Sequence, residues 1–310
     1  MKMEHMEQSS AFVDLSEDDL RQIMDETGYV ADERILTTVY LSLRLGKPLL
    51  IEGEPGCGKT ELGKVLAAGF DTDLIRLQCY EGLTADSALY EWNYAKQLLS
   101  LQASDQLADG ESVFSEEYLL ERPLLRALSN DGSTPPVLLI DEIDRADEEF
   151  EALLLEILSD FQVSIPEFGT VQAETPPIVV ITSNRTRGLS DALKRRCIYL
   201  HIDTPSFEKE REIVRRKVPE LSPEFASESV RLIQRIREKP LLKQPGVSET
   251  LDLARAVEAL RTDGERSIAD IDIEHALGVV LKEGADIEQI GDMVIEELLE
   301  EAAEIRNASD

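Results

Sequence analysis

The chain has 310 residues, 42% of them hydrophobic, and it carries 63 acidic against 32 basic residues, a net charge of −31. This length admits one large core and a second, smaller one, while the acidic surface disfavours nucleic-acid binding because it repels the phosphate backbone. Because there is no apolar run of membrane-spanning length, no signal-peptide pattern and no metal or disulfide spacing among the three cysteines, we expect a soluble cytoplasmic protein without membrane contact.

The first predicted elements are a polar lead and two helices. Residues 1–14 are expected to be flexible. Ser16 with Asp19 three residues later resembles a capping box, which predicts that a short helix begins here. A second helix is expected from Asp32 to Gly46, because its apolar residues recur at helical spacing.

A phosphate-binding motif follows a short apolar strand. Its eight residues fit G-x-x-x-x-G-K-[ST] and read Gly53-Glu54-Pro55-Gly56-Cys57-Gly58-Lys59-Thr60. The glycines allow backbone N–H groups to wrap phosphate oxygens at the start of a helix. Lys59 is expected to reach the β- and γ-phosphates and the Thr60 hydroxyl to ligate Mg²⁺. We therefore predict a nucleotide site that also includes Glu61; a chance glycine turn is the alternative.

The pattern between this motif and the next central strand is mixed. Residues 74–79 predict a second strand. Residues 84–115 are ambiguous, because Tyr90–Tyr94 alternate as in a strand while Leu98–Leu101 are typical of a helix. Within this stretch the tryptophan is assigned to packing or an interface. Ser115–Leu128 is predicted to form one helix.

Two continuous apolar runs, each preceded by a proline pair, predict central strands of a parallel sheet that is covered on both faces. They span residues 137–140 and 178–181. Between them we expect a helix over residues 150–158 and a hairpin over 161–171. A last strand is expected over residues 197–202.

Polar side chains follow both apolar runs at the strand end, where open α/β sheets bind their ligands. Asp141 is expected to hold Mg²⁺ through its water shell, and Glu142 to orient or deprotonate an attacking water. Asn184, after the second run, is placed to bond a γ-phosphate oxygen or that water. The alternatives are solvated acids at a strand end and an asparagine that merely favours a turn.

Three consecutive cations, Lys194-Arg195-Arg196, stand out in a chain of net charge −31. Phosphoryl transfer spreads negative charge over the γ-phosphate oxygens, and an arginine from a neighbouring subunit can stabilise it. We therefore take this segment as a candidate arginine finger. Surface charge or a salt bridge is the alternative.

From Pro205 onward the pattern is helical. Helices are expected over residues 207–218, 223–236, 248–260 and 268–281. We predict three parts: a lead at 1–14, an αβα nucleotide-binding domain built on a parallel sheet at 15–204, and an all-helical domain at 205–310. The acidic end of the last part keeps an apolar stripe, so it is predicted to be a surface helix.

With these residues in place, the sequence resembles the AAA+ ATPases, and more narrowly the MoxR family near its CoxD-like branch, over roughly residues 30–290. The resemblance rests on Gly53–Thr60 as Walker A, Val137–Glu142 as Walker B, and the segments Ile143–Asp147, Ser183–Arg187, Asp191–Cys197 and Gly246–Leu251. It implies that Asn184 is sensor 1 and Arg196 the arginine finger, with Arg195 beside it.

The resemblance further implies a P-loop αβα sandwich followed by a small helical lid domain, with ATP and Mg²⁺ as cofactors. It implies a ring, usually a homo-hexamer, in which ATP lies at subunit interfaces. It also implies chaperone-like work with a von Willebrand A-domain partner to mature a metalloenzyme, in this branch a molybdenum hydroxylase or carbon monoxide dehydrogenase-like client.

The sequence departs from the family pattern at one position. Thr250 stands where many relatives carry a sensor 2 arginine, and Arg255 lies about 140° further round a helix. Two other functions stay open from the residues alone. One is a nucleotide-gated binding module with negligible turnover. The other, which the net charge opposes, is a nucleic-acid remodelling ATPase.

Overall fold

The computed structural model describes residues 12–103, 113–130, 132, 134–262, 267–271 and 277–290. Their contacts divide the chain into two compact units. The first takes residues from 1–27, 31–53 and 59–201, and the second takes residues from 28–30, 54–58 and 202–310.

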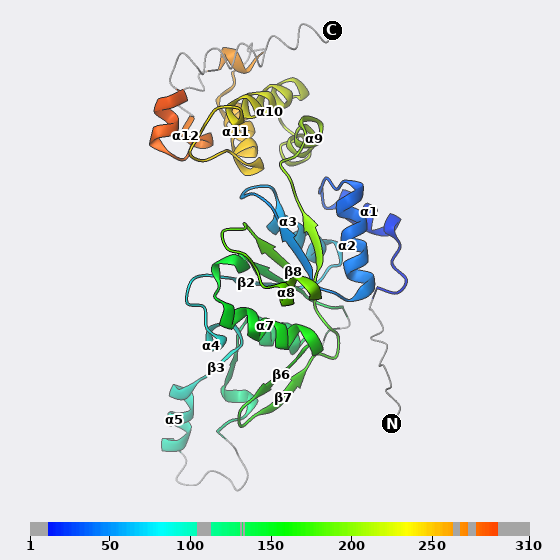
Figure 1. Cartoon of the computed structure of the whole chain (residues 1–310), viewed down its shortest axis with the longest axis vertical. Helices are drawn as coiled ribbons and strands as arrows, with labels where there is room; N and C mark the ends of the chain where they lie inside the picture. Colours follow the sequence, from blue (N-terminus) through cyan, green and yellow to red (C-terminus); the bar gives the residue numbers. More distant parts are fainter. Residues whose placement is uncertain are drawn as a thin grey trace. The chain divides into compact units, whose positions relative to one another are not determined.

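A five-stranded parallel sheet forms the centre of the first unit (Figure 1). Its strand order is β2-β5-β8-β1-β9. The strands span Leu49–Glu52 (β1), Leu74–Gln78 (β2), Val137–Asp141 (β5), Ile178–Ser183 (β8) and Ile198–His201 (β9). Every residue of β1, β5 and β8 is buried. The predicted central strands are confirmed, since continuous apolar runs suit strands covered on both faces.

Helices pack on both faces of this sheet. Helix α3 (Lys59–Gly69) contacts β2, β5 and β8, and a Cβ on Gly63 would lie 3.2 Å from a methyl carbon of Leu139. Helix α6 (Pro123–Leu128) contacts β2 and β5 and shares a core with Leu138 and Ile140. Because successive strand side chains point to opposite faces, α3 and α6 cover opposite sides.

The two N-terminal helices are confirmed. Helix α1 (Glu17–Glu26) begins with the predicted capping box, in which Asp19 N donates to Ser16 Oγ at 3.1 Å and Ser16 N donates to Asp19 Oδ2 at 3.0 Å. Helix α2 (Glu33–Leu45) is capped by Asp32 and ends at Gly46, whose φ of 60° is left-handed. Residues 1–11 of the predicted lead lie outside the described residues.

The ambiguous stretch after β2 contains short elements of both kinds. They are α4 (Ala85–Ala88), β3 (Tyr90–Trp92), α5 (Tyr94–Ala103) and β4 (Leu119–Glu121), with β3 and β4 antiparallel. The single helix predicted for Ser115–Leu128 is wrong, because a 3₁₀ turn and β4 precede α6. Proline disfavours helical backbone at Arg122 but fits the first helical position, so α6 begins at Pro123.

The helix and hairpin predicted between the central strands are confirmed. Helix α7 spans Glu148–Asp160, and β6 (Gln162–Ile165) pairs antiparallel with β7 (Gly169–Gln172). Helix α8 (Asp191–Arg196) then leads into β9. Among the residues that the structure describes, no helix has both the length and the hydropathy needed to cross a bilayer.

The second unit is helical. Helices α9 (Phe207–Lys217), α10 (Pro223–Arg237) and α11 (Val247–Leu260) pack around one apolar core, as predicted. The helix predicted over 268–281 is wrong at its start, since Ile268–Asp270 is a 3₁₀ turn and α12 covers Leu277–Val280. Residues 272–276, and most of the predicted acidic terminal helix, lie outside the described residues.

A buried ion pair joins three helices of the second unit. Glu210 of α9 is fully buried and accepts hydrogen bonds from Arg237 of α10 at 2.7 and 2.8 Å. Thr250 of α11 donates to the same carboxylate at 2.5 Å. Arg237 also donates from Nε to the carbonyl of Pro245 at 2.7 Å, so one guanidinium links α9 with the chain that enters α11.

Replacing Arg237 by alanine should destabilise the second unit by about 3–5 kcal/mol, because Glu210 would stay buried without its counter-charge. Urea unfolding followed by far-UV circular dichroism measures this loss, while fluorescence of Trp92 reports on the first unit. The control is Arg255→Ala, which breaks an exposed pair with Asp252 and should cost less than about 0.5 kcal/mol. An equal loss of unfolding free energy in the two variants would contradict the stabilising role of Arg237.

Candidate functional site

The phosphate-loop motif runs from a strand through a loop into a helix, as such motifs require. Gly53 directly follows β1, and its N–H donates to Ser183 O at 3.4 Å. Gly56 and Gly58 have φ of 78° and 94°, a left-handed conformation that glycine adopts without a Cβ clash. Helix α3 then begins at Lys59.

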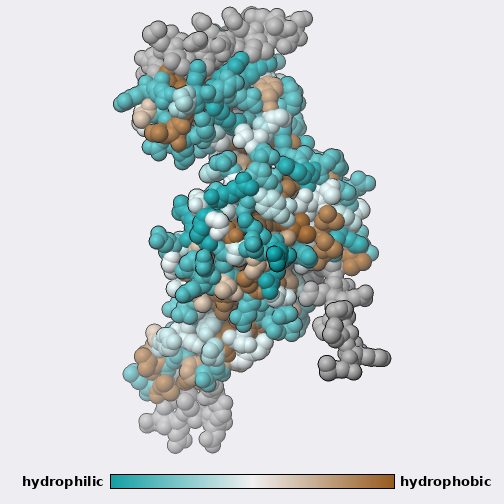
Figure 2. All heavy atoms as spheres, in the orientation of Figure 1, coloured by the Kyte–Doolittle hydropathy of each residue, from teal (hydrophilic) through white to brown (hydrophobic). Residues whose placement is uncertain are grey.

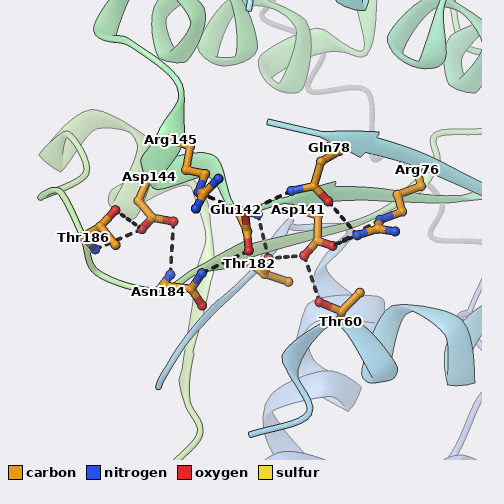
Figure 3. Close-up of polar contacts among 10 residues, drawn as sticks. All are labelled: Thr60, Arg76, Gln78, Asp141, Glu142, Asp144, Arg145, Thr182, Asn184 and Thr186. Atoms are coloured by element: carbon orange, nitrogen blue, oxygen red, sulfur yellow. Dashed lines mark hydrogen bonds and ion pairs between the residues drawn. The ribbon is translucent and has the colours of Figure 1, made fainter. Parts of the chain in front are cut away.

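The two side chains that end the motif lie in the first unit. Lys59 is buried, and its ammonium donates to Gly53 O at 2.7 Å. The Thr60 hydroxyl donates to Asp141 Oδ1 at 2.9 Å (Figure 3). The structure therefore brings together the hydroxyl and the carboxylate that the sequence predicted as neighbours of one metal ion.

Asp141 ends β5 and is 3% exposed. Besides Thr60, its carboxylate accepts a bond from Thr182 Oγ1 at 2.6 Å and bonds from Arg76 Nε and Nη2 at 3.1 and 2.5 Å (Figure 3). Arg76 donates both bonds to Oδ2, so the other oxygen, Oδ1, is the one that accepts from the Thr60 hydroxyl. These two hard oxygen donors fit Mg²⁺, which takes few protein ligands and fills its octahedron with water and phosphate oxygens.

Glu142 is held by three side chains from different segments. Asn184 Nδ2 lies 3.3 Å from Oε1, while Gln78 Nε2 and Arg145 Nε each lie 3.1 Å from Oε2 (Figure 3). Its backbone has a φ of 57°, a left-handed conformation that is strained for a side chain with a Cβ. Thr182 stabilises this turn, because its hydroxyl accepts a bond from Glu142 N at 2.9 Å.

Asp144 positions the segment that carries Asn184. Its carboxylate accepts bonds from Asn184 N at 3.1 Å and from Thr186 N and Oγ1 at 2.9 and 2.5 Å. Burial raises the pKa of this carboxyl, but the bonds from Thr186 and Asn184 outweigh burial and hold the pKa below its ordinary value of 3.8. Asp144 therefore stays charged at neutral pH and fixes Asn184 beside Glu142.

A second carboxylate anchors the residue after Asn184. Arg185 has a φ of 61°, and its Nε donates to Glu52 Oε2 at 2.8 Å; Tyr199 donates to the same oxygen at 2.9 Å. Burial raises the pKa of Glu52, yet the bonds from Arg185 and Tyr199 bring it below its ordinary value. The turn after β8 is thus held at Asn184 and at the two residues that follow it.

The predicted finger residues lie elsewhere in the first unit, in the last turn of α8. Arg196 is exposed and donates from Nε to Ser159 Oγ at 3.1 Å. Within the described ranges, neither Arg195 nor Arg196 forms an ion pair or contacts Asp141, Glu142 or Asn184. The structure therefore unites Thr60, Asp141, Glu142 and Asn184 but leaves the two arginines apart.

Sequence reasoning missed four residues that hold the two acids: Arg76, Gln78, Arg145 and Thr182. Arg76 and Gln78 alternate in β2 with buried residues, which indicates that they share one face. Arg76 also donates to Gln78 Oε1 at 2.6 Å, so β2 connects both carboxylates. The alternation was visible, but the pairing of β2 with β5 was not.

The second unit contains a cavity beside its part of the motif. Its volume is about 520 Å³, and its lining comprises Glu54, Pro55, Cys57, Thr204, Pro205, Arg237 and the segment 242–247. Val247 N donates to Gly56 O at 3.0 Å, and a Cβ on Gly246 would lie 2.9 Å from Gly56 Cα. Only a glycine at 246 allows this close approach.

Thr250, the residue at the position of the absent sensor 2 arginine, is fully buried in the network of Glu210 and Arg237. Arg255 is exposed and pairs with Asp252 at 3.1 Å. Neither residue lines the cavity, whereas Arg237 does. The arginine that lines this cavity therefore lies on α10, whereas Thr250 and Arg255 lie on α11.

Comparison with known proteins gives a family match that covers the phosphate motif and most of the first unit. Residues 48–197 match the family model of the AAA domain, dynein-related subfamily. The uncharacterized protein YehL of Escherichia coli (strain K12) is 33% identical over 175 residues, which cover 54% of this chain and 43% of that protein. The uncharacterized protein SAB1265c of Staphylococcus aureus (strain bovine RF122 / ET3-1) is 27% identical over 180 residues, 56% of this chain and 62% of that protein.

The chain thus covers less than two thirds of the length of either relative.

Among solved structures, a mutant of Thermotoga maritima RuvB is 19% identical over 77% of this chain and 62% of that chain, with a TM-score of 0.44. The Thermotoga maritima RuvB Holliday junction branch migration motor is 15% identical over 87% of this chain and 67% of that chain, with a TM-score of 0.40.

Proposed function

We propose, from the match of residues 48–197 to the family model of the AAA domain, dynein-related subfamily, that this chain hydrolyses ATP and uses the turnover to remodel a partner protein. The P-loop AAA+ fold predicted from the sequence is confirmed. One observation supports hydrolysis most directly: Thr60, Asp141, Glu142 and Asn184 converge at the ends of adjacent strands and at the start of α3 (Figure 3).

In this proposal the motif holds the nucleotide and a metal ion. Backbone N–H groups of residues 53–58 and the Lys59 ammonium bind phosphate oxygens. Thr60 and Asp141 would hold Mg²⁺, which when bound would neutralise charge on the phosphates. Arg76 orients the Asp141 carboxylate toward Thr60. The Lys59 ammonium, which donates to Gly53 O in the structure, would donate to phosphate oxygens when the nucleotide is bound.

Glu142 is the residue proposed to orient the attacking water and accept its proton. Its carboxylate is directed by Gln78, Arg145 and Asn184. Because Asn184 donates one amide hydrogen to Glu142 Oε1, its second amide hydrogen is left to bond the water or a γ-phosphate oxygen. This contact supports a role for Asn184 in positioning the γ-phosphate or the attacking water relative to Glu142, the proposed general base.

We also assign the nucleoside to the cavity of the second unit. Glu54, Pro55 and Cys57, which line it, belong to the phosphate motif itself. Its volume of about 520 Å³ is within the range of small-molecule sites. Arg237 would then contact the nucleoside. Its side chain is held in place by hydrogen bonds to the Glu210 carboxylate and to the carbonyl of Pro245.

The narrower family, the ring and the partners are proposed from sequence motifs. We propose a MoxR-type ATPase that forms a homo-hexameric ring, with Arg196 reaching the nucleotide of the neighbouring subunit. Its exposure and its lack of a carboxylate partner among the described residues support that role. We further propose that it acts with a von Willebrand A-domain protein to mature a metalloenzyme of the molybdenum hydroxylase or carbon monoxide dehydrogenase kind.

Lys59→Ala tests the nucleotide site. Calorimetric titration with ATP and Mg²⁺ should show an affinity on the order of 10- to 100-fold weaker, because one charge-assisted bond to phosphate is lost. The matched control is Lys64→Ala on the same helix, an exposed lysine paired with Glu61, which should bind ATP as the unmodified chain does. Unchanged affinity in the Lys59 variant would remove this loop from the proposal.

A further inference from the structure

A second cavity lies in the first unit, outside the proposed ATP site. Its volume is about 560 Å³, and it is formed by α4, β3, the start of α5 and the residue before α6. Its lining comprises Tyr80, Asp86, Ser87, Tyr90, Glu91, Trp92, Tyr94 and Arg122. Four of these eight residues are aromatic, in a chain that is 5% aromatic overall.

The aromatic side chains form a fixed floor and an exposed rim. Trp92 is 8% exposed and meets Phe114 edge-on, with ring centroids 5.2 Å apart; Tyr90 meets it in the same way at 6.2 Å. Tyr80 and Tyr94 are 48% and 62% exposed. Large aromatic side chains left this exposed around a hollow are typical of a binding surface.

The charge of the cavity is negative. Arg122 pairs with Glu91, so these two charges offset each other. Asp86 has no cationic partner among the residues that the structure describes. Burial, and after it the charge of Asp86, raise the pKa of the Tyr90 hydroxyl, so Asp86 acts on a neighbouring side chain of the cavity lining. A cation is therefore attracted both by Asp86 and by the aromatic faces.

Helix α5 extends the surface with apolar residues. Two side chains of α5 are hydrogen-bonded to the rest of the unit: Gln97 Nε2 donates to Val113 O at 2.7 Å, and Ser100 Oγ accepts from the Tyr118 hydroxyl at 2.9 Å. Leu98, Leu99 and Leu101 are 58%, 67% and 46% exposed. Figure 2 shows hydrophobic residues gathered where Figure 1 places α5. The surface thus combines a cation-attracting cavity with an adjoining leucine face.

We propose that this cavity binds an arginine side chain of a partner polypeptide whose neighbouring residues are apolar and pack on α5. Arginine suits the site better than lysine, because its planar guanidinium stacks on aromatic rings and pairs in bidentate fashion with a carboxylate. A nucleic acid does not suit it, since Asp86 and the net charge of −31 repel phosphate. The inference rests on the proposed function only in taking the bound polypeptide as the partner that is remodelled.

The chain carries its own reporter, since Trp92 in the cavity floor is its single tryptophan. The probe is the capped peptide Ser-Leu-Arg-Leu-Leu-Ser, titrated into the full chain without nucleotide while tryptophan fluorescence is recorded. Its matched peptide carries citrulline, the neutral isostere of arginine. We expect a saturable change with the arginine peptide and roughly 5-fold weaker binding, or more, with the citrulline peptide.

Asp86→Asn should weaken binding of the arginine peptide and leave the citrulline peptide unaffected. Asp160→Asn, an exposed acid at the end of α7, is the matched control and should change neither. Equal affinity for the two peptides, no saturable signal, or no effect of Asp86→Asn would overturn the proposal. A change of sedimentation mass in Asp86→Asn would also overturn it, by identifying the occupant as a second copy of the chain.

The same preparation is assayed for ATP hydrolysis, so that the two proposals fail separately. Hydrolysis without discrimination between the peptides overturns the arginine cavity and leaves the ATPase assignment standing. Discrimination without any hydrolysis overturns the ATPase assignment and leaves the cavity standing.

Discussion

Replacing Glu142 by glutamine should reduce ATP hydrolysis about 10²- to 10⁴-fold while ATP affinity stays unchanged. Glutamine has the shape of glutamate but only one acceptor oxygen, so it keeps the bond from Asn184 or the bond from Gln78 and not both. What disappears is the carboxylate that takes a proton from water. Steady-state phosphate release measures the first effect, and calorimetry with ATP and Mg²⁺ measures the second.

Glu149→Gln is the matched control for this change. Glu149 is an exposed acid in the first turn of α7, so its replacement alters the same functional group a short distance along the chain. It should hydrolyse ATP at the rate of the unmodified protein. Near-normal turnover in the Glu142 variant would exclude Glu142 as the base, and loss of ATP binding would point instead to a structural role in the strained turn.

Arg196→Ala should bind ATP normally and hydrolyse it about 10³- to 10⁵-fold more slowly, if the guanidinium stabilises transferred charge on a neighbouring subunit. Hydrolysis per chain by the unmodified protein should then rise with protein concentration as rings form. Mixing Arg196→Ala with Lys59→Ala should restore part of the turnover, because some interfaces then join an intact pocket to an intact arginine. Phosphate release across a mixing series measures this rescue.

Two further variants distinguish an Arg196 that acts on a neighbouring subunit from an Arg196 that only makes a structural contact within its own subunit. Arg196 donates only to Ser159 among the described residues, so Ser159→Ala removes that contact and keeps the guanidinium. It should retain activity, and so should Arg126→Ala, an exposed arginine of α6. If Ser159→Ala loses as much activity as Arg196→Ala, or if co-assembled mixtures show no rescue, the arginine does not act in trans.

Much of the first unit could be predicted because its signals are local. The capping box at Ser16 and the glycine at 46 mark helix ends through contacts within four residues. The apolar runs of β5 and β8 indicate strands buried on both faces. The helix predicted at Ser115–Leu128 is wrong for a local reason as well, since apolar spacing continues across Pro123 although that proline marks where α6 begins.

The candidate site divides in the same way. Lys59, Thr60, Asp141 and Glu142 were identified from short motifs whose chemistry demands those residue types. Asn184 was expected near them because the ends of parallel strands meet at one edge, and it lies 3.3 Å from Glu142. The roles of these residues, and of Arg195 and Arg196, stay predictions.

By itself, therefore, the sequence determined the phosphate motif, the acidic strand end and the change from a sheet to a helical unit. Only the tertiary structure decided which side chains hold those acids. Arg76 and Gln78 reach Asp141 and Glu142 because β2 pairs with β5, a strand more than fifty residues later in the chain. Such pairing is set by packing between distant segments, and residue periodicity carries no information about which strands become neighbours or in which register.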